Sequence, residues 1–149
     1  MLKKILLATD LSDASDAPTQ MALEARKLIG GDLIVVYVIE AMMEAKNWFL
    51  PDTAAMEALR DAIAHEQEAV QERLAAKMAA FGVTDSDVRV LHGRPADAIV
   101  DCADEVGADL IVIGTHGRRG VQRAVMGSVA TRVARTAGRP VLVVPVPGA

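Results

Sequence analysis

Five short apolar runs, rich in β-branched residues, recur along the chain. Four of them are nearly continuous apolar stretches rather than alternations of apolar and polar residues, which is typical of strands covered on both faces of a sheet. The separations between the runs are too long for β-hairpins. The pattern predicts buried strands at Lys4–Ala8, Leu33–Ile39, Val88–Leu91, Leu110–Ile113 and Val141–Val146.

Helical patterns fill the intervals between the runs, and capping residues and glycines mark their ends. Residues 41–50 are interpreted as a connection or an extra turn between the second run and the second helix. The four predicted helices begin between Ser12 and Asp16, after Thr53, at Pro95 and at Ser128, and they end at Gly30, Gly82, Gly107 and Gly138.

The second helix carries apolar residues at steps of three, four or seven positions, which is the spacing of one face of a helix. We expect this face to pack on the core along the whole helix. Its members are Met56, Leu59, Ile63, Val70, Leu74, Met78 and Phe81.

Strands and helices therefore alternate along a chain of 149 residues, a length that corresponds to one domain. Parallel strands joined by right-handed crossovers place helices on both faces of the sheet. The sequence predicts an α/β fold, a single doubly wound, Rossmann-like domain over residues 1–149 with a five-stranded parallel sheet.

The composition and net charge of the chain argue against several classes of binding partner. Aromatic residues make up only 3% of the chain, which argues against stacking on single-stranded nucleic acid, and the net charge of −4 argues against coating nucleic acid or binding an anionic membrane. No apolar run approaches the roughly 20 residues needed to span a bilayer, and the first strand reaches Asp10 too early for a signal peptide. We expect a cytoplasmic protein. Its one cysteine, Cys102, is expected to be a small core residue.

The densest chemical signal follows the fourth strand, in the stretch from Gly114 to Gly120 and the pair Gly127-Ser128 at the next helix start. Glycines let backbone N–H groups approach a phosphate, and a helix N-terminus offers unpaired donors and a favourable dipole. Positive charge would come from Arg118, with Arg119 and Arg123 close by. The alternative is that the glycines only form tight turns.

This loop is neither a Walker A loop nor a dinucleotide fingerprint, because no lysine follows the second glycine pair and the first strand ends in Ala8-Thr9-Asp10. The spacing Gly114-x-x-Gly117, nine residues, Gly127-Ser128 resembles the nucleotide-binding signature of the universal stress protein family. The resemblance covers the chain essentially end to end, in Lys3–Asp10 with Ser12 and Ser15, Val36–Glu40, Gly93–Ala96, Ala108–Gly117, Gly127–Ala130 and Arg139–Pro145.

The resemblance implies the strand order 3-2-1-4-5, with the switch point of the sheet between the first and fourth strands. Ligands of open α/β sheets bind outside the carboxyl ends of the strands at that point. The implied ligand is ATP, expected to bind with Mg²⁺, and no metal ligand from the protein is predicted. The implied contacts are Ala8 and Asp10 at the adenosine end, Val38 through its backbone to adenine, Ile113 and Gly114 on the ribose side, and Gly117, Gly127, Ser128 and Val129 around the phosphates. Arg118 is added to this site because of its positive charge in the same loop.

Asp10 and the loop residue His116 each have more than one interpretation. Asp10 is also suited to cap the first helix. His116 lies in the phosphate loop, but no carboxylate partner for it is identifiable, so we interpret it as a ligand contact or as a residue without a role in the site, rather than as a catalytic base. Asp13 and Asp16 are expected to complement the dipole of the first helix. No catalytic residue is predicted.

The fifth strand, Val141–Val146, is apolar and is placed at a sheet edge by the order 3-2-1-4-5. An open edge presents unpaired backbone groups, so we expect a homodimer in which two fifth strands pair. The leading function is a nucleotide-binding regulatory or stress-response protein. A slow ATP hydrolase or nucleotidyl transferase on the same fold is an alternative, and a dimeric interaction module without nucleotide is another.

Overall fold

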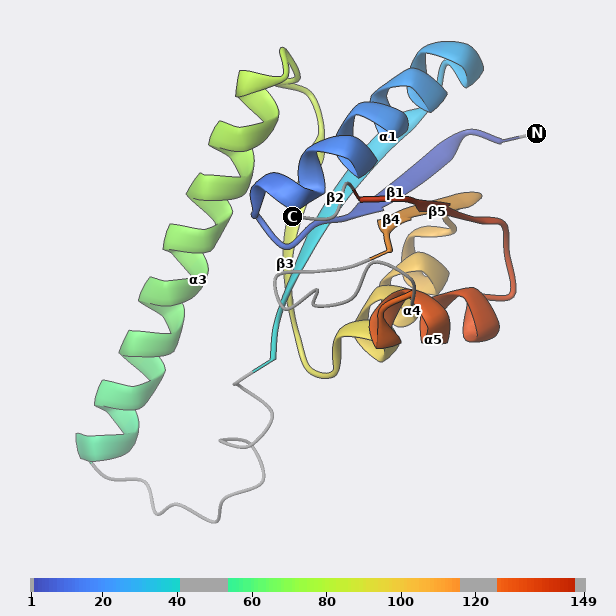
Figure 1. The fold of residues 1–149 in the computed structure, drawn as a ribbon. Coiled ribbons are helices and arrows are strands. Elements are labelled where there is room, and N and C mark those ends of the chain that lie inside the picture. The colour runs from blue at the N-terminus through green and yellow to red at the C-terminus, as the bar shows by residue number, and fades with distance from the viewer. Residues whose placement is uncertain (1, 41–53, 116–125, 147–149) are drawn as a thin grey trace.

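The computed structural model describes residues 2–40, 54–115 and 126–146. Within these ranges strands and helices alternate in the predicted order (Figure 1). The elements are β1 (Lys4–Ala8), the short 3-10 helix η1 (Asp13–Ser15), α1 (Asp16–Ile29), β2 (Asp32–Ile39), α3 (Ala54–Ala80), β3 (Asp87–His92), α4 (Pro95–Val106), β4 (Leu110–Gly114), α5 (Ser128–Thr136) and β5 (Val141–Val144).

The five strands form one parallel sheet in the order β3-β2-β1-β4-β5, which confirms the predicted fold class and strand order. Leu7 of β1 lies opposite Val35 of β2 and Val112 of β4. The chain thus moves outward from β1 in one direction and, after β3, crosses to the other side of β1. The switch point between β1 and β4 follows from this crossing.

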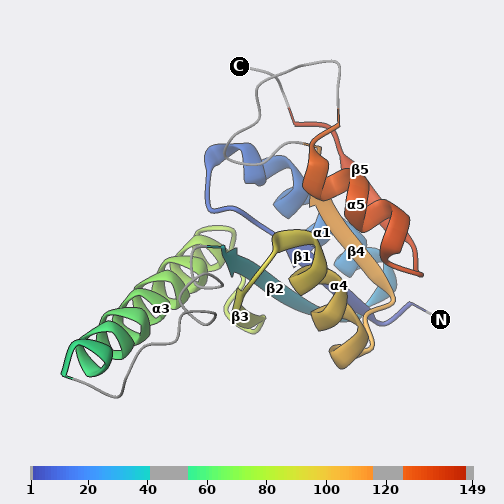
Figure 2. The same ribbon diagram turned by 90° about the horizontal axis from the view of Figure 1, so that it is seen from below.

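Residues along each central strand alternate between two apolar layers. Ile5 and Leu7 pack with the buried residues of α1 and α3, whereas Leu6 packs with those of α4 and α5. All three side chains are fully buried. In Figure 1, α1 lies above the sheet and α4 and α5 lie below it, and Figure 2 shows the latter pair on the near face. Burial on both faces explains why the strands are continuously apolar in sequence.

Glycines end two helices as predicted. Gly30 and Gly107 adopt left-handed backbone conformations at the C-termini of α1 and α4, with φ of 66° at each. Gly31 is needed for a different reason, because a Cβ atom at this position would lie 2.1 Å from the carbonyl oxygen of Lys3. The connection from α1 to β2 therefore packs directly on the backbone that enters β1.

Several predicted boundaries differ from the observed ones by one or two residues; for example, α3 ends at Ala80, two residues before Gly82. Helix α5 ends at Thr136 with Ala137 as its C-cap, two residues before Gly138. Strand β5 ends at Val144, immediately before Pro145, whose missing N–H cannot continue a strand ladder.

The prediction that α3 packs on the core along its whole length is also wrong. Only Val70, Leu74 and Met78 of its apolar stripe are buried, whereas Leu59 is 36% exposed and Ile63 is half-buried. Figure 1 shows the reason, since α3 extends well past the end of the sheet. Apolar periodicity identifies the face of a helix but not how far its packing partner reaches.

Cys102 is buried in α4 as predicted, and burial raises the pKa of its thiol. Across the described ranges, no helix combines the length and the apolar character needed to cross a membrane.

Candidate functional site

Strands β1 and β4 separate at their carboxyl ends. The pairing between them ends at Leu7 and Val112. Beyond that point the backbone of β1 turns toward β2, with the Thr9 N–H donating to the carbonyl oxygen of Val36 at 3.0 Å. The backbone of β4 turns toward β5, with the Thr115 N–H donating to Val144 at 3.0 Å. The two strands at the switch point therefore diverge at their carboxyl ends, which is the position at which open α/β sheets bind ligands.

The loop after β1 is held in a tight, strained conformation. Oδ1 of Asp10 accepts hydrogen bonds from the backbone N–H of Ser12 at 2.9 Å and from its hydroxyl at 2.6 Å. Between them, Leu11 has a φ of 67°, a left-handed conformation that side chains with a Cβ rarely adopt. Strained backbone of this kind is concentrated at binding sites.

Near the carboxyl end of β4, α5 begins without a side-chain cap. Its N-cap is Gly127, with φ of −60° and ψ of 155°. Any residue can adopt this conformation, so the backbone angles do not require glycine. What glycine provides is the absence of a side chain in front of the helix N-terminus.

The first turn of α5 presents its backbone donors outward. The carbonyl oxygen of Gly127 accepts the first helical hydrogen bonds, from the N–H of Thr131 at 3.0 Å and from its hydroxyl at 2.9 Å. The N–H groups of Ser128, Val129 and Ala130 precede this bond and have no partner within the helix. Together with the helix dipole, they form an arrangement suited to an anion such as a phosphate.

The structure places the described candidate residues at or near the carboxyl ends of the strands and at the start of α5. Ala8 is the last residue of β1, and Gly114 is the last residue of β4. Ile113, which precedes Gly114, is buried, and Val38 near the end of β2 is half-buried. Asp10 follows β1, and Gly127, Ser128 and Val129 start α5. Gly117 and Arg118 lie outside the described residues, as do His116, Arg119 and Arg123.

The alternative role of Asp10 as a helix cap is met only in part. Its carboxylate organises the turn that leads into η1, but Ser12 is the N-cap of η1 and Ser15 is the N-cap of α1. Asp16 opens α1 and Asp13 opens η1, as expected for residues that complement a helix dipole.

Sequence reasoning did not identify Lys77, which comes from α3 and contacts the loop after β1. Its Nζ donates to the Ser12 carbonyl oxygen at 2.7 Å and to Ser15 Oγ at 2.6 Å, and it lies 3.1 Å from Oδ1 of Asp16. A signal existed, because Lys77 follows Val70 by seven positions and therefore lies on the buried side of α3.

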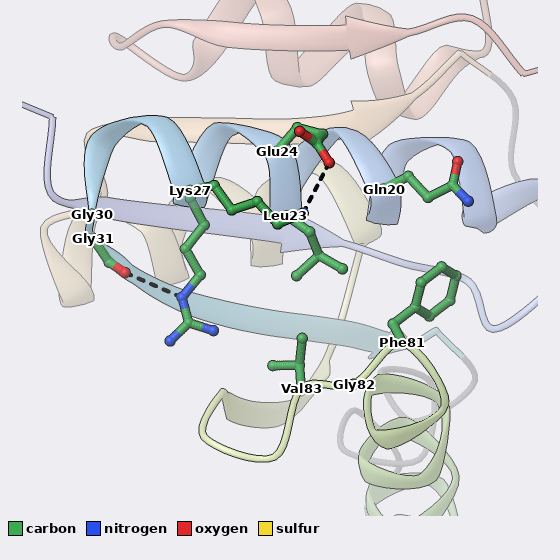
Figure 3. Close-up of a pocket in the computed structure, with 10 residues that line it drawn as sticks. Gln20, Leu23, Glu24, Lys27, Gly30, Gly31, Phe81, Gly82 and Val83 are labelled. Carbon is green, nitrogen blue, oxygen red and sulfur yellow. Dashed lines mark hydrogen bonds and ion pairs between the residues drawn. The ribbon is translucent and has the colours of Figure 1, made fainter.

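A separate surface cavity of about 630 Å³ lies between α1 and the turn from α3 to β3 (Figure 3). Leu23 and Phe81 project into it, and Lys27 and Glu24 pair at its rim. None of the residues predicted to contact nucleotide lines this cavity.

Comparison with known proteins agrees with the sequence signature. The model of the universal stress protein family matches residues 1–145. MJ0531, a universal stress protein of Methanocaldococcus jannaschii, is 35% identical over 148 residues, which are 99% of this chain and 84% of the relative.

Solved structures show the same fold. MJ0577 from the same organism has a TM-score of 0.75 at 24% identity, with 100% of this chain and 99% of that chain covered. A universal stress protein solved in complex with cAMP has a TM-score of 0.67 at 28% identity, with 95% and 96% covered. By sequence and by fold, the chain belongs to the universal stress protein family.

Proposed function

We propose that this protein is a cytoplasmic regulatory protein that binds ATP at the carboxyl ends of β1 and β4, where these strands diverge, and that changes its partner contacts with the bound nucleotide. The observation that carries the proposal is the divergence of these strands after Leu7 and Val112, with the uncapped N-terminus of α5 on one side and the Asp10 loop on the other. A universal stress protein solved with cAMP supports an adenine nucleotide as the ligand class.

In this proposal the phosphates bind the first turn of α5. The N–H groups of Ser128 and Val129 and the hydroxyl of Ser128 would donate to phosphate oxygens, and Gly127 would let them approach. Gly117 and Arg118 would complete the phosphate site from the preceding loop. These donors need no rearrangement of the helix, since Gly127 already closes its first turn through Thr131.

The adenosine end would lie on the β1 side. Ala8 and the backbone of Val38 would line the adenine position, Asp10 would bind at the adenosine end, and Ile113 and Gly114 would pack along the ribose. Backbone contacts discriminate poorly between bases, so recognition of adenine would depend on shape and on few hydrogen bonds.

Mg²⁺ would arrive with the triphosphate. This ion binds proteins through one or two carboxylates and otherwise keeps water and phosphate oxygens as ligands. Among the described residues no group of three or more His, Cys, Asp and Glu side chains could hold a metal. Phosphate oxygens and water molecules would supply most of the Mg²⁺ ligands.

We also propose a homodimer through β5, which is an edge strand of the sheet. Its residues Val141, Leu142 and Val143 are each only half-buried. Pairing of two such strands about a two-fold axis would cover this edge and leave the proposed nucleotide site outside the interface.

Calorimetric titration with ATP, ADP, AMP, cAMP and GTP tests the ligand class. We expect ATP to bind more tightly than AMP, because the additional phosphates would reach the N-terminus of α5. If AMP binds as tightly as ATP, the phosphates do not contact α5 and the proposed orientation is wrong. If none of the five nucleotides binds, the nucleotide-binding function is wrong.

A further inference from the structure

The ammonium group of Lys77 has three acceptors on one short segment. These are the Ser12 carbonyl oxygen, the Ser15 hydroxyl and the Asp16 carboxylate, at 2.7, 2.6 and 3.1 Å. A lysine ammonium carries three N–H donors, so this set matches its full donor capacity. The side chain is only 17% exposed, and Ser15 is buried. The contact is therefore an anchored junction between α3 and the loop after β1.

The junction continues toward the nucleotide site through one residue. Ser12 accepts from Lys77 with its carbonyl oxygen and donates to Oδ1 of Asp10 with both its N–H and its hydroxyl. The Ser15 N–H and hydroxyl also donate to the same Ser12 carbonyl oxygen, at 3.0 and 2.7 Å. The orientation of the Asp10 carboxylate is thus tied to the position of Lys77.

The loop needs such an external anchor because its own backbone is strained. Leu11 lies between Asp10 and Ser12 with a φ of 67°. Conformations of this kind persist only where the surrounding structure holds them. Lys77 is well placed to do so, because Leu74 and Met78 on either side of it are buried and fix this part of α3 on the sheet.

We propose that Lys77 is a positioning residue for nucleotide binding. Its ammonium holds the segment from Asp10 to Ser15 in the conformation that receives the adenosine end of the ligand, and so couples α3 to the site. The inference rests on the proposed function. By linkage, nucleotide binding would in turn tighten the contact between α3 and this loop.

A purely structural role for Lys77 makes a different prediction, and Arg26 supplies the matched control. Arg26 is also a partly buried cation, and it ties α1 to the segment between α3 and β3 through the ion pair with Asp85 at 2.6 Å. Its side chain is 23% exposed, close to the 17% of Lys77. Arg26 lies in the last turn of α1, at the end opposite to the Asp10 loop. Removing either cation destabilises the fold, but only Lys77 contacts the loop.

The experiment compares wild type, Lys77→Met, Lys77→Arg and Arg26→Met. Hydrogen exchange of the Ser12 and Ser15 amides is measured without ligand, and ATP affinity is measured by calorimetry. We expect Lys77→Met to speed exchange at both amides and to weaken ATP binding about tenfold, within the range known for residues that act through a coupled element. Lys77→Arg should recover most of the affinity, and Arg26→Met should change neither readout.

The outcomes separate the two proposals. If the wild type binds ATP but Lys77→Met changes neither the ATP affinity nor the exchange rates of the two amides, the proposed role of Lys77 is wrong while the proposed function stands. Equal losses of affinity in Lys77→Met and Arg26→Met also overturn it, since the effect would then be general destabilisation. If the wild type binds no ATP, the proposed function fails and the role of Lys77 in binding fails with it.

If Lys77→Met does not fold, Ser15→Ala removes one acceptor with little change in packing. It should weaken ATP binding about threefold on the same coupling argument, and unchanged affinity overturns the proposal.

Discussion

The backbone N–H of Gly127 donates a hydrogen bond of 2.6 Å to the carbonyl oxygen of Thr115. These residues flank residues 116–126, which include Gly117 of the glycine signature. The bond fixes Gly127, the N-cap of α5, at the carboxyl end of β4. Because only backbone atoms form it, a side chain can be introduced at Gly127 without removing it.

Asp109 should make stability depend on pH at the amino end of the sheet. Its Oδ2 accepts hydrogen bonds from the backbone N–H groups of Lys3 and Lys4, at 2.8 and 2.9 Å, and these bonds lower the pKa of the carboxyl group. A lowered pKa in the folded state means that the carboxylate stabilises the fold above the pKa of the unfolded chain. That stabilisation is lost as pH falls through the lower, folded-state pKa.

Asp109→Asn should therefore lower the melting temperature at pH 7, with the difference from wild type shrinking below about pH 4, where free aspartates titrate. Thermal melts from pH 2 to pH 8 measure this. Asp101→Asn, at an exposed position of α4, is the control. A difference between wild type and Asp109→Asn that stays constant with pH would contradict the assigned role of the carboxylate.

Arg139 joins the end of α4 to the turn before β5. Its Nη1 donates to the carbonyl oxygens of Ala103 and Ala108, at 2.7 Å each, its Nε donates to Ala137, and its Nη2 pairs with Asp104. Arg139→Met should destabilise the protein by about 1–3 kcal/mol, because it removes the charged donor from the carbonyl oxygens of Ala108 and Ala137, while the carbonyl oxygen of Ala103 keeps its bond from the Ala108 N–H.

Urea unfolding measures this loss, with Arg135→Met on the exposed part of α5 as the control. The control should change the free energy of unfolding by less than about 0.5 kcal/mol, as is usual for surface substitutions. Equal effects of the two substitutions would show that the carbonyl contacts of Arg139 do not contribute.

Val143→Pro should dissociate the proposed homodimer. The carbonyl oxygens of Pro140 and Val144 accept bonds from β4, and backbone groups alternate in direction along a strand. The N–H of Val143 therefore points to the open edge, and proline removes this donor without breaking the β4 ladder. Light scattering at micromolar concentration should show a dimeric wild type and a monomeric Val143→Pro, with dimers kept in Val143→Ala. A monomeric wild type, or a folded Val143→Pro that still dimerises, would contradict this interface.

The strands and most helix ends could be predicted from the sequence because their causes are local. A strand buried on both faces must be apolar at every position, and a helix that stops at Gly30 or Gly107 needs a residue that tolerates a left-handed backbone. The packing of α3 could not be predicted in full. Its apolar stripe continues to Met56, but the sheet does not extend beneath it that far.

The candidate site also combines features that could be predicted from the sequence with features that could not. The strand order, which the family resemblance implied, makes β1 and β4 neighbours and so brings the residues at their carboxyl ends close together. The contact of Lys77 with Ser12 joins positions 65 residues apart, and no local pattern encodes such a pair. The strain at Leu11 was likewise not visible, since leucine has no special preference for a left-handed conformation.

Calorimetric titration of ATP into wild type and Gly127→Val tests the central claim most directly. Valine can adopt the backbone angles of Gly127, so the variant should fold, but its side chain would lie in front of the α5 N-terminus. Ala134→Val adds similar bulk at an exposed position of the same helix and is the control. We expect ATP to bind wild type and Ala134→Val alike and to bind Gly127→Val more than about tenfold more weakly, a loss of at least ~1.4 kcal/mol. A folded Gly127→Val that binds ATP with wild-type affinity would contradict a phosphate site at the start of α5.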